Sequence, residues 1–298
     1  MSLYDLLVAP LADNPFMRRA LVAGLALALA AAPVGVLLVL RRLALLGDAL
    51  AHGILPGVAV GFALAGGFSA LAMSAGGLAA GLLVALAAGW IARANLVRED
   101  AALAGAYLTA LALGVAMVSA GGGRGSDLVH LLFGSVLAVD APALLFIAAA
   151  SSVTLLALAV FWRGFVLETL DAAFLGASGS RPGRWQAGFL ALVVLNLVAA
   201  CQAVGTLMAV GLMMLPALAA GFWASGLGGI VRAAAALAVL SVLAGLLVSF
   251  HLDVASGPAI VLAAALLWIA SMLAGPVGSL AARLVSSRRV GHPPLRRA

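Results

Sequence analysis

The sequence predicts an all-α fold, a polytopic bundle of helices that spans a membrane as a single domain over residues 1–298. Three observations carry this prediction: 65% of the residues are hydrophobic, only 9% are charged, and the mean hydropathy is +1.24. A soluble chain would carry about 25% charged residues. The composition therefore excludes a soluble globular protein, a disordered chain and a nucleic-acid-binding domain, although the sequence pI is 11.2. We expect the lipid bilayer to surround the chain, and no nucleic acid to bind it.

Nine apolar segments come close to the ~20 residues that a membrane span requires. They cover 19–40, 46–66, 70–92, 101–120, 141–162, 186–202, 204–223, 230–250 and 257–276. A continuous helix over 186–223 would be roughly 57 Å long, against a hydrocarbon core of ~30 Å. A reversal near Gln202 and Gly205 fits better, and the count becomes eight if this reversal is only a half-helix.

Arginine placement predicts the orientation in the membrane. All sixteen basic residues are Arg. With nine spans, one side of the membrane receives Arg41, Arg42, Arg93, Arg98, Arg163, Arg181, Arg184, Arg232 and the tail over 279–298. By the positive-inside rule, this side and the C-terminus are cytoplasmic and the N-terminus is external. Arg18, Arg19 and Arg124 fall on the other side.

Two kinds of residue exclude several enzyme classes. The chain contains no Lys, so it has no P-loop and no Schiff-base lysine. Cys201 is the single cysteine, which permits neither an intrachain disulfide nor a thiolate zinc site. We therefore do not expect an enzyme, and any ATP hydrolysis that drives this protein must come from a separate subunit.

Asp48 and His52 form the clearest pair of ionisable residues inside a predicted span. Their spacing of four places both side chains on one face of a helix. A carboxylate with an imidazole suits Zn²⁺, Mn²⁺ or Fe²⁺, and ionisable residues in a span mark transport pathways by default. The alternative is that the two side chains only bond each other and neighbouring helices. Two ligands leave a metal site incomplete, so others must come from another helix, a second copy or water.

Prolines and glycines predict helix breaks near this pair and further along the chain. Pro56 lacks an N–H, so the carbonyl of His52 loses its helical partner. Gly57 keeps the neighbouring surface small. Together with Gly205 and Pro216, these residues are candidate helix breaks or gates.

His251 and Asp253 lie at the predicted external end of a span. They are candidates for the mouth through which an ion enters, and the alternative is that they anchor the helix at the membrane interface.

The longest predicted cytoplasmic connection runs from about residue 163 to 185. A short helix is expected over 168–179, where Asp171 could cap it, Phe174 would project from it and Gly179 could stop it. This helix is either an amphipathic loop helix at the lipid interface or a docking element for a soluble partner.

At these residues the chain resembles the permease subunit of manganese/zinc/iron-type ABC importers. The similarity covers nearly the whole chain through the blocks NPFMRRAL, VLLVLRRLALLGDALAHGILPGVAVGF, HLLFGSVLAV, LETLDAAFLGASG, CQAVGTLMAVGLMMLPALAA and SFHLDVASGPAIVL. The Gly-Asp-x-x-x-His segment is a specific part of it. The chain departs from the family in two places: Ala51 stands where many relatives have Ser, and Ala219-Ala220-Gly221 stands where an Arg often follows.

The resemblance implies a vitamin-B12-importer-like ABC permease that imports Mn, Zn or Fe by alternating access across the bacterial cytoplasmic (inner) membrane. It implies that Asp48 and His52 line the path, and that Leu170 to Gly179 is the coupling helix, which inserts into an ATPase. The implied partners are a second permease in a homodimer, two cytoplasmic ATP-binding subunits and an extracytoplasmic metal-binding protein. The metal is cargo, and no permanently bound cofactor is expected.

Three alternatives compete with this reading. A permease for a metal chelate or vitamin would need a wider path without paired ligands. A stand-alone secondary metal transporter would give no role to the segment 171–179. An intramembrane enzyme would need a nucleophile with a base, or an HExxH zinc helix, and the sequence contains neither.

Overall fold

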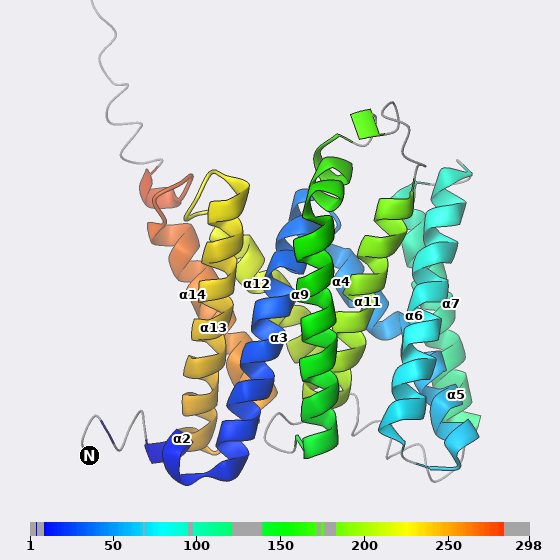
Figure 1. The fold of residues 1–298 in the computed structure, drawn as a ribbon, viewed down its shortest axis with the longest axis horizontal. Helices are drawn as coiled ribbons and strands as arrows, with labels where there is room; N and C mark the ends of the chain where they lie inside the picture. Colours follow the sequence, from blue (N-terminus) through cyan, green and yellow to red (C-terminus); the bar gives the residue numbers. More distant parts are fainter. Residues whose placement is uncertain are drawn as a thin grey trace, which may run out of the picture.

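The structure, a computed structural model, describes residues 4, 9–67, 69–94, 98–120, 139–171, 174–175 and 183–282. The regular elements in these ranges are all α-helices, and the long ones run side by side as a bundle (Figure 1). The predicted all-α fold is therefore confirmed. Gly179 and the tail residues 283–298 lie outside the described ranges.

Eight segments in the described ranges are long and apolar enough to cross a membrane. They are α3 (Pro15–Leu40), α4 with α5 (Ala44–Gly53 and Leu55–Ala65), α6 (Ala70–Arg93), α7 (Glu99–Ala120), α9 (Ala141–Leu170), α11 (Arg184–Val204), α13 (Leu227–Leu252) and α14 (Ser256–Ala274). A further apolar helix, α12 (Thr206–Ala220), has 15 residues, and the short α2 (Ala9–Asp13) precedes α3. Each of the nine predicted segments thus corresponds to a helix or a broken helix.

The chain reverses between α11 and α12 at Gly205. Its φ of 84° and ψ of 164° lie in a region that is essentially restricted to glycine. The Gly205 N–H donates to the carbonyl of Cys201, and the Gly205 carbonyl accepts from Ala209, each over 3.1 Å. The predicted reversal near Gln202 and Gly205 is confirmed.

The centre of the bundle is built from α3 and α12. Helix α3 contacts α9, α12 and α13, and α12 also contacts α14. A Cβ at Gly35 of α3 would collide with the carbonyl oxygen of Met213 in α12. Such close backbone contact is how helices associate in lipid, where dispersion and hydrogen bonds replace the hydrophobic effect. It explains why this chain is so rich in Ala and Gly.

The predicted span over 46–66 is broken into α4 and α5 at Ile54. Pro56 lies in the first turn of α5, where its missing N–H leaves no bond unmade. The Ile54 N–H donates to the carbonyl of Leu50 over 3.1 Å. Pro56 has no N–H to offer the carbonyl of His52, as the sequence predicts.

Gly57 allows α5 to touch α6. A Cβ at Gly57 would fall on the carbonyl oxygen of Gly76, and a Cβ at Gly76 would fall on the carbonyl oxygen of Gly57. The structure thus gives Gly57 a packing role beside the break.

Helix α9 is longer than expected, because it continues from Ala141 through Leu170 instead of ending near residue 162. Its 30 residues span about 45 Å, which exceeds a bilayer core of ~30 Å. The final turns carry Phe161 and Phe165, whose rings pack on Trp185 of α11. The short helix expected over 168–179 was therefore wrong at its start, since residues 168–170 belong to α9.

Candidate metal site

Asp48 and His52 lie on one face of α4, as the spacing predicts. Asp48 Oδ1 and His52 Nε2 are 3.6 Å apart, and the two side chains are 63% and 41% exposed in the single chain. The contact is an ion pair only when the imidazole is protonated. With a neutral imidazole, both atoms are free to face a third group that lies between or beside them.

The face of α4 that carries the pair is open, whereas its opposite face is packed. Leu45 precedes Asp48 by three residues and is exposed on the same stripe. On the packed side, a Cβ at Gly47 would meet the ends of Met213 and Met214 of α12. Helix α4 therefore packs against α12 on one face and presents its polar pair on the other, open face.

One chain supplies only part of a metal site. No group of three or more His, Cys, Asp or Glu side chains that could hold an ion is found among the described residues. The thiol of Cys201 is buried in α11 and belongs to no such group. Any ion held by Asp48 and His52 must take its other ligands from water, from backbone oxygens or from another chain.

A cavity of about 380 Å³ adjoins Asp48 at the start of α4. Its polar wall consists of Arg42, Asp48 and Tyr107, and Leu43 and Leu103 are part of its apolar wall. Tyr107 comes from α7 and is half-buried. Its phenol can donate a hydrogen bond or accept one. The cavity thus offers a carboxylate and a hydroxyl to a hydrated cation, next to one repelling guanidinium.

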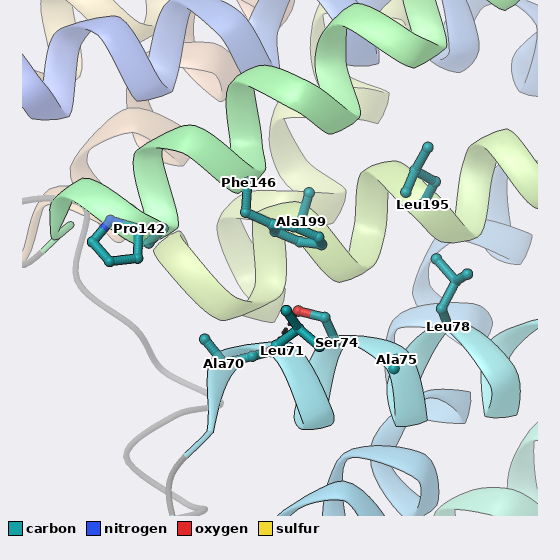
Figure 2. Close-up of a pocket in the computed structure, with 10 residues that line it drawn as sticks. Ala70, Leu71, Ser74, Ala75, Leu78, Pro142, Phe146, Leu195 and Ala199 are labelled. Carbon is teal, nitrogen blue, oxygen red and sulfur yellow. Dashed lines mark hydrogen bonds between the residues drawn. The ribbon is translucent and has the colours of Figure 1, made fainter.

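A second cavity of about 380 Å³ is of a different kind. Figure 2 shows Leu71, Ser74 and Leu78 of α6 facing Phe146 of α9 and Leu195 of α11. Its single side-chain hydroxyl, on Ser74, donates to the carbonyl of Ala70 over 2.7 Å. A metal ion would find no ligand set here, so the apolar cavity is not a second candidate for the ion path.

His251 and Asp253 are exposed at the end of α13, with Asp253 in a left-handed conformation at φ 50°. This end of the bundle is opposite to the start of α4 (Figure 1). The structure does not bring these two residues to the Asp48–His52 pair. Pro216 is buried inside α12, which continues through it without ending.

The segment after α9 begins as the sequence suggests. Asp171 Oδ1 accepts a hydrogen bond of 2.9 Å from the Phe174 N–H, which is the geometry of a helix N-cap. Leu170 and Phe174 are both exposed. The capping role predicted for Asp171 is confirmed, and two large apolar side chains project beside it.

Comparison with protein-family models identifies the family of the chain. The model of the ABC 3 transport family matches residues 13–275, which include every described spanning helix from α3 to α14. The chain belongs to the ABC 3 transport family. It is thus a multi-span permease subunit of an ABC importer of the bacterial inner membrane, and not the catalytic subunit.

Individual ABC 3 relatives match almost end to end. The manganese transport system membrane protein MntC of Halalkalibacterium halodurans is 31% identical over 274 residues, 92% of each chain. The chelated iron transport system membrane protein YfeD of Yersinia pestis is 28% identical over 271 residues, 91% of this chain and 89% of YfeD. The solved structure of PsaBC from Streptococcus pneumoniae in complex with Fab has a TM-score of 0.80 at 27% identity, and covers 94% of this chain and 98% of that chain.

Sequence reasoning missed Tyr107 and Arg42 of this ABC 3 permease as neighbours of Asp48. A signal for Tyr107 was available, because it is one of only two tyrosines and its hydroxyl falls inside a predicted span. Arg42 was interpreted only as a marker of orientation. Its place beside Asp48 depends on the turn between α3 and α4, which residue spacing does not predict.

Proposed function

We propose that this ABC 3 permease moves a divalent transition-metal ion, manganese before iron or zinc, inward by ATP-driven alternating access. The observation that carries the proposal is the Asp48–His52 pair, with its oxygen and nitrogen 3.6 Å apart on a spanning helix. Such an oxygen–nitrogen ligand pair suits Mn²⁺, Fe²⁺ and Zn²⁺. Manganese is named in MntC, and chelated iron is named in the more distant YfeD.

A second copy of the chain is the proposed partner of the exposed face of α4. A carboxylate that is 63% exposed on a spanning helix would be costly in hydrocarbon. In a homodimer with α4 against α4, the carboxylates and imidazoles of both copies would face each other. Four protein ligands then surround one ion, which solves the shortage of ligands within one chain.

Two ATP-binding subunits are the proposed partners of the arginine-rich end. The described arginines toward the end where α3 and α9 finish and α4, α11 and α13 begin include Arg41, Arg42, Arg163, Arg184 and Arg232. The positive-inside rule makes this end cytoplasmic, which places the C-terminus inside and the N-terminus outside. Leu170, Asp171 and Phe174 belong to the same end, and with Gly179 they form the proposed coupling segment that contacts the ATPase.

The opposite end is the proposed docking side for an extracytoplasmic metal-binding protein. His251 and Asp253 lie there, and a delivered ion would pass them before reaching α4. The helix breaks beside Pro56 with Gly57 and at Gly205 are the proposed points where the path opens and closes. Pro216 does not break α12, and it is proposed as a gate residue within that helix.

The proposed transport cycle follows from this arrangement. An ion released outside loses part of its water to the two Asp48 and two His52 side chains. ATP binding and hydrolysis move the coupling segments, and the dimer opens inward. The ion then enters the cavity beside Asp48, where the Tyr107 hydroxyl can bind its water and the Arg42 guanidinium weakens its binding.

Uptake of ⁵⁴Mn by vesicles that contain the complete transporter tests this function, with ⁶⁵Zn measured beside it. Loss of even an outer-shell group costs about 10–100-fold in metal affinity, so Asp48→Asn and His52→Gln should each lower uptake by about 100-fold or more. Asp13→Asn is the matched control, because Asp13 is exposed at the end of α2. Unchanged uptake in both site variants would mean that the pair only bonds within the helix bundle and that the ion path lies elsewhere.

A further inference from the structure

Arg41 connects two segments that are 128 residues apart in the chain. Its Nε donates a hydrogen bond of 2.8 Å to Thr169 Oγ1, and its Nη2 donates one of 3.3 Å to the carbonyl oxygen of Phe165. Thr169 Oγ1 in turn donates to the same carbonyl over 2.6 Å. The guanidinium thus holds the last turn of α9 at two points.

An aromatic surface fixes the plane of the Arg41 guanidinium. Its Cζ lies 4.4 Å from the ring centre of Phe189 in α11, a cation–π distance. Phe189 is fully buried, and its ring packs 6.0 Å from the ring of Phe165. Arg41, Phe165, Thr169 and Phe189 therefore form one contact between the ends of α3, α9 and α11, which we call the Arg41 joint.

The Arg41 joint lies between the two functional segments proposed above. Thr169 is in the last turn of α9, next to the coupling residues Leu170 and Asp171. On the other side, Arg41 ends α3 and is followed by a short turn into α4, which carries Asp48. Arg42 in this turn has a φ of 59°, which a non-glycine residue adopts only when its surroundings hold it there.

We propose that Arg41 is a positioning residue that transmits movement of the coupling segment to α4 and its metal ligands. This inference rests on the proposed function. When the end of α9 moves, the two hydrogen bonds carry the Arg41 side chain with it, and the short turn passes that displacement to the start of α4. Lysine cannot replace arginine in this role, because a point charge lacks the planar fork that bonds Thr169 and Phe165 while stacking on Phe189.

The ratio of ATP hydrolysed to ⁵⁴Mn imported tests Arg41 in vesicles that contain the complete transporter and its delivery protein. Arg41→Lys should lower uptake by about tenfold while ATP hydrolysis falls less than about twofold, because charge-assisted bonds are lost but the ATPase is untouched. Arg19→Lys is the matched control, since Arg19 is exposed near the start of α3, at the opposite end of that helix from Arg41. Its ratio should equal that of the parent.

Thr169→Val provides the second variant, because it removes only the hydroxyl that accepts from Arg41. It should raise the ratio of ATP to Mn by about threefold, and the double variant with Arg41→Lys should be no worse than Arg41→Lys alone. Thr109→Val is its control, since Thr109 makes the same bond to the carbonyl four residues earlier and is exposed. If the transporter with Arg41→Lys does not assemble, the ATP-to-Mn ratio of Thr169→Val alone decides whether the joint takes part in coupling.

Two results would overturn the role of Arg41. Uptake and ATP hydrolysis that fall in the same proportion would make the joint merely structural, and uptake that is unchanged in both variants would exclude it from coupling. A parent transporter that imports no metal would instead refute the proposed function, so the two failures are distinguishable.

Discussion

The Asp48–His52 pair and the Arg41 joint are close in the chain, yet they are built in opposite ways. In the joint, Arg41 meets two acceptors and an aromatic ring of its own chain, and Phe189 is fully buried. The pair is open, with side chains 63% and 41% exposed and a single contact of 3.6 Å. A contact that is complete within one chain serves position and stability, whereas the open pair is the one for which we propose a second copy and a metal ion as partners.

Low pH should affect the Asp48–His52 pair and leave the Arg41 joint unchanged, which is the largest difference that we expect between the two regions. Protons compete with a metal ion for a ligand nitrogen, so we expect uptake to be lower at a pH of about 5.5 than at about 7.5. The side chains of the Arg41 joint do not titrate in this range. ATP hydrolysis and thermal stability should therefore change little, and both are measured in the same buffers.

The control for acid is the His52→Gln variant, whose residual uptake should be independent of pH. Uptake by the parent that is equal at both pH values, with the delivery protein shown to be unaffected, would contradict a ligand role for His52.

The joint can be weakened without touching the pair by Phe189→Leu. Loss of the ring removes a cation–π contact and an aromatic pair, so the free energy of unfolding should fall by about 1–2 kcal/mol. Thermal unfolding in detergent measures this, while Mn²⁺ affinity at Asp48 and His52 should stay within about twofold of the parent. A large loss of Mn²⁺ affinity with unchanged stability would mean that the two regions are not distinct.

Tyr107→Phe tests a residue that lies beside the Asp48–His52 pair without belonging to it. The change removes one hydroxyl from the cavity beside Asp48, and one neutral hydrogen bond is worth about 0.5–1.5 kcal/mol. Manganese uptake should fall by about threefold with stability retained. Tyr4→Phe is the control, because Tyr4 is the other tyrosine and is exposed near the N-terminus. Equal uptake in both variants would remove Tyr107 from the path.

Most of the fold follows from the sequence because lipid imposes one strong rule. Each span must form all its backbone hydrogen bonds internally, as a helix of about 20 apolar residues. The segments that meet this requirement can be recognised in the sequence. Helix ends were harder to predict. Helix α9 continues past Arg163 since its final turns bury Phe165 against Trp185 and Phe189, a tertiary contact that hydropathy does not register.

The candidate site was predictable to a similar degree. Asp48 and His52 are four residues apart on a helix, so their shared face follows from geometry alone. Tyr107 and Arg41 were missed, because their contacts join segments that are distant in sequence. Arg41 was read only as one of many positive charges, and nothing in its neighbours distinguishes it from Arg42.

The most direct test of the account is the electron paramagnetic resonance of Mn²⁺ bound to the purified complete transporter. Asp48 and His52 shared between two copies predict one Mn²⁺ for every two permease chains. They also predict nitrogen couplings from imidazole, which should disappear in His52→Gln. One Mn²⁺ for each permease chain, or nitrogen couplings that persist in His52→Gln, would contradict the shared site.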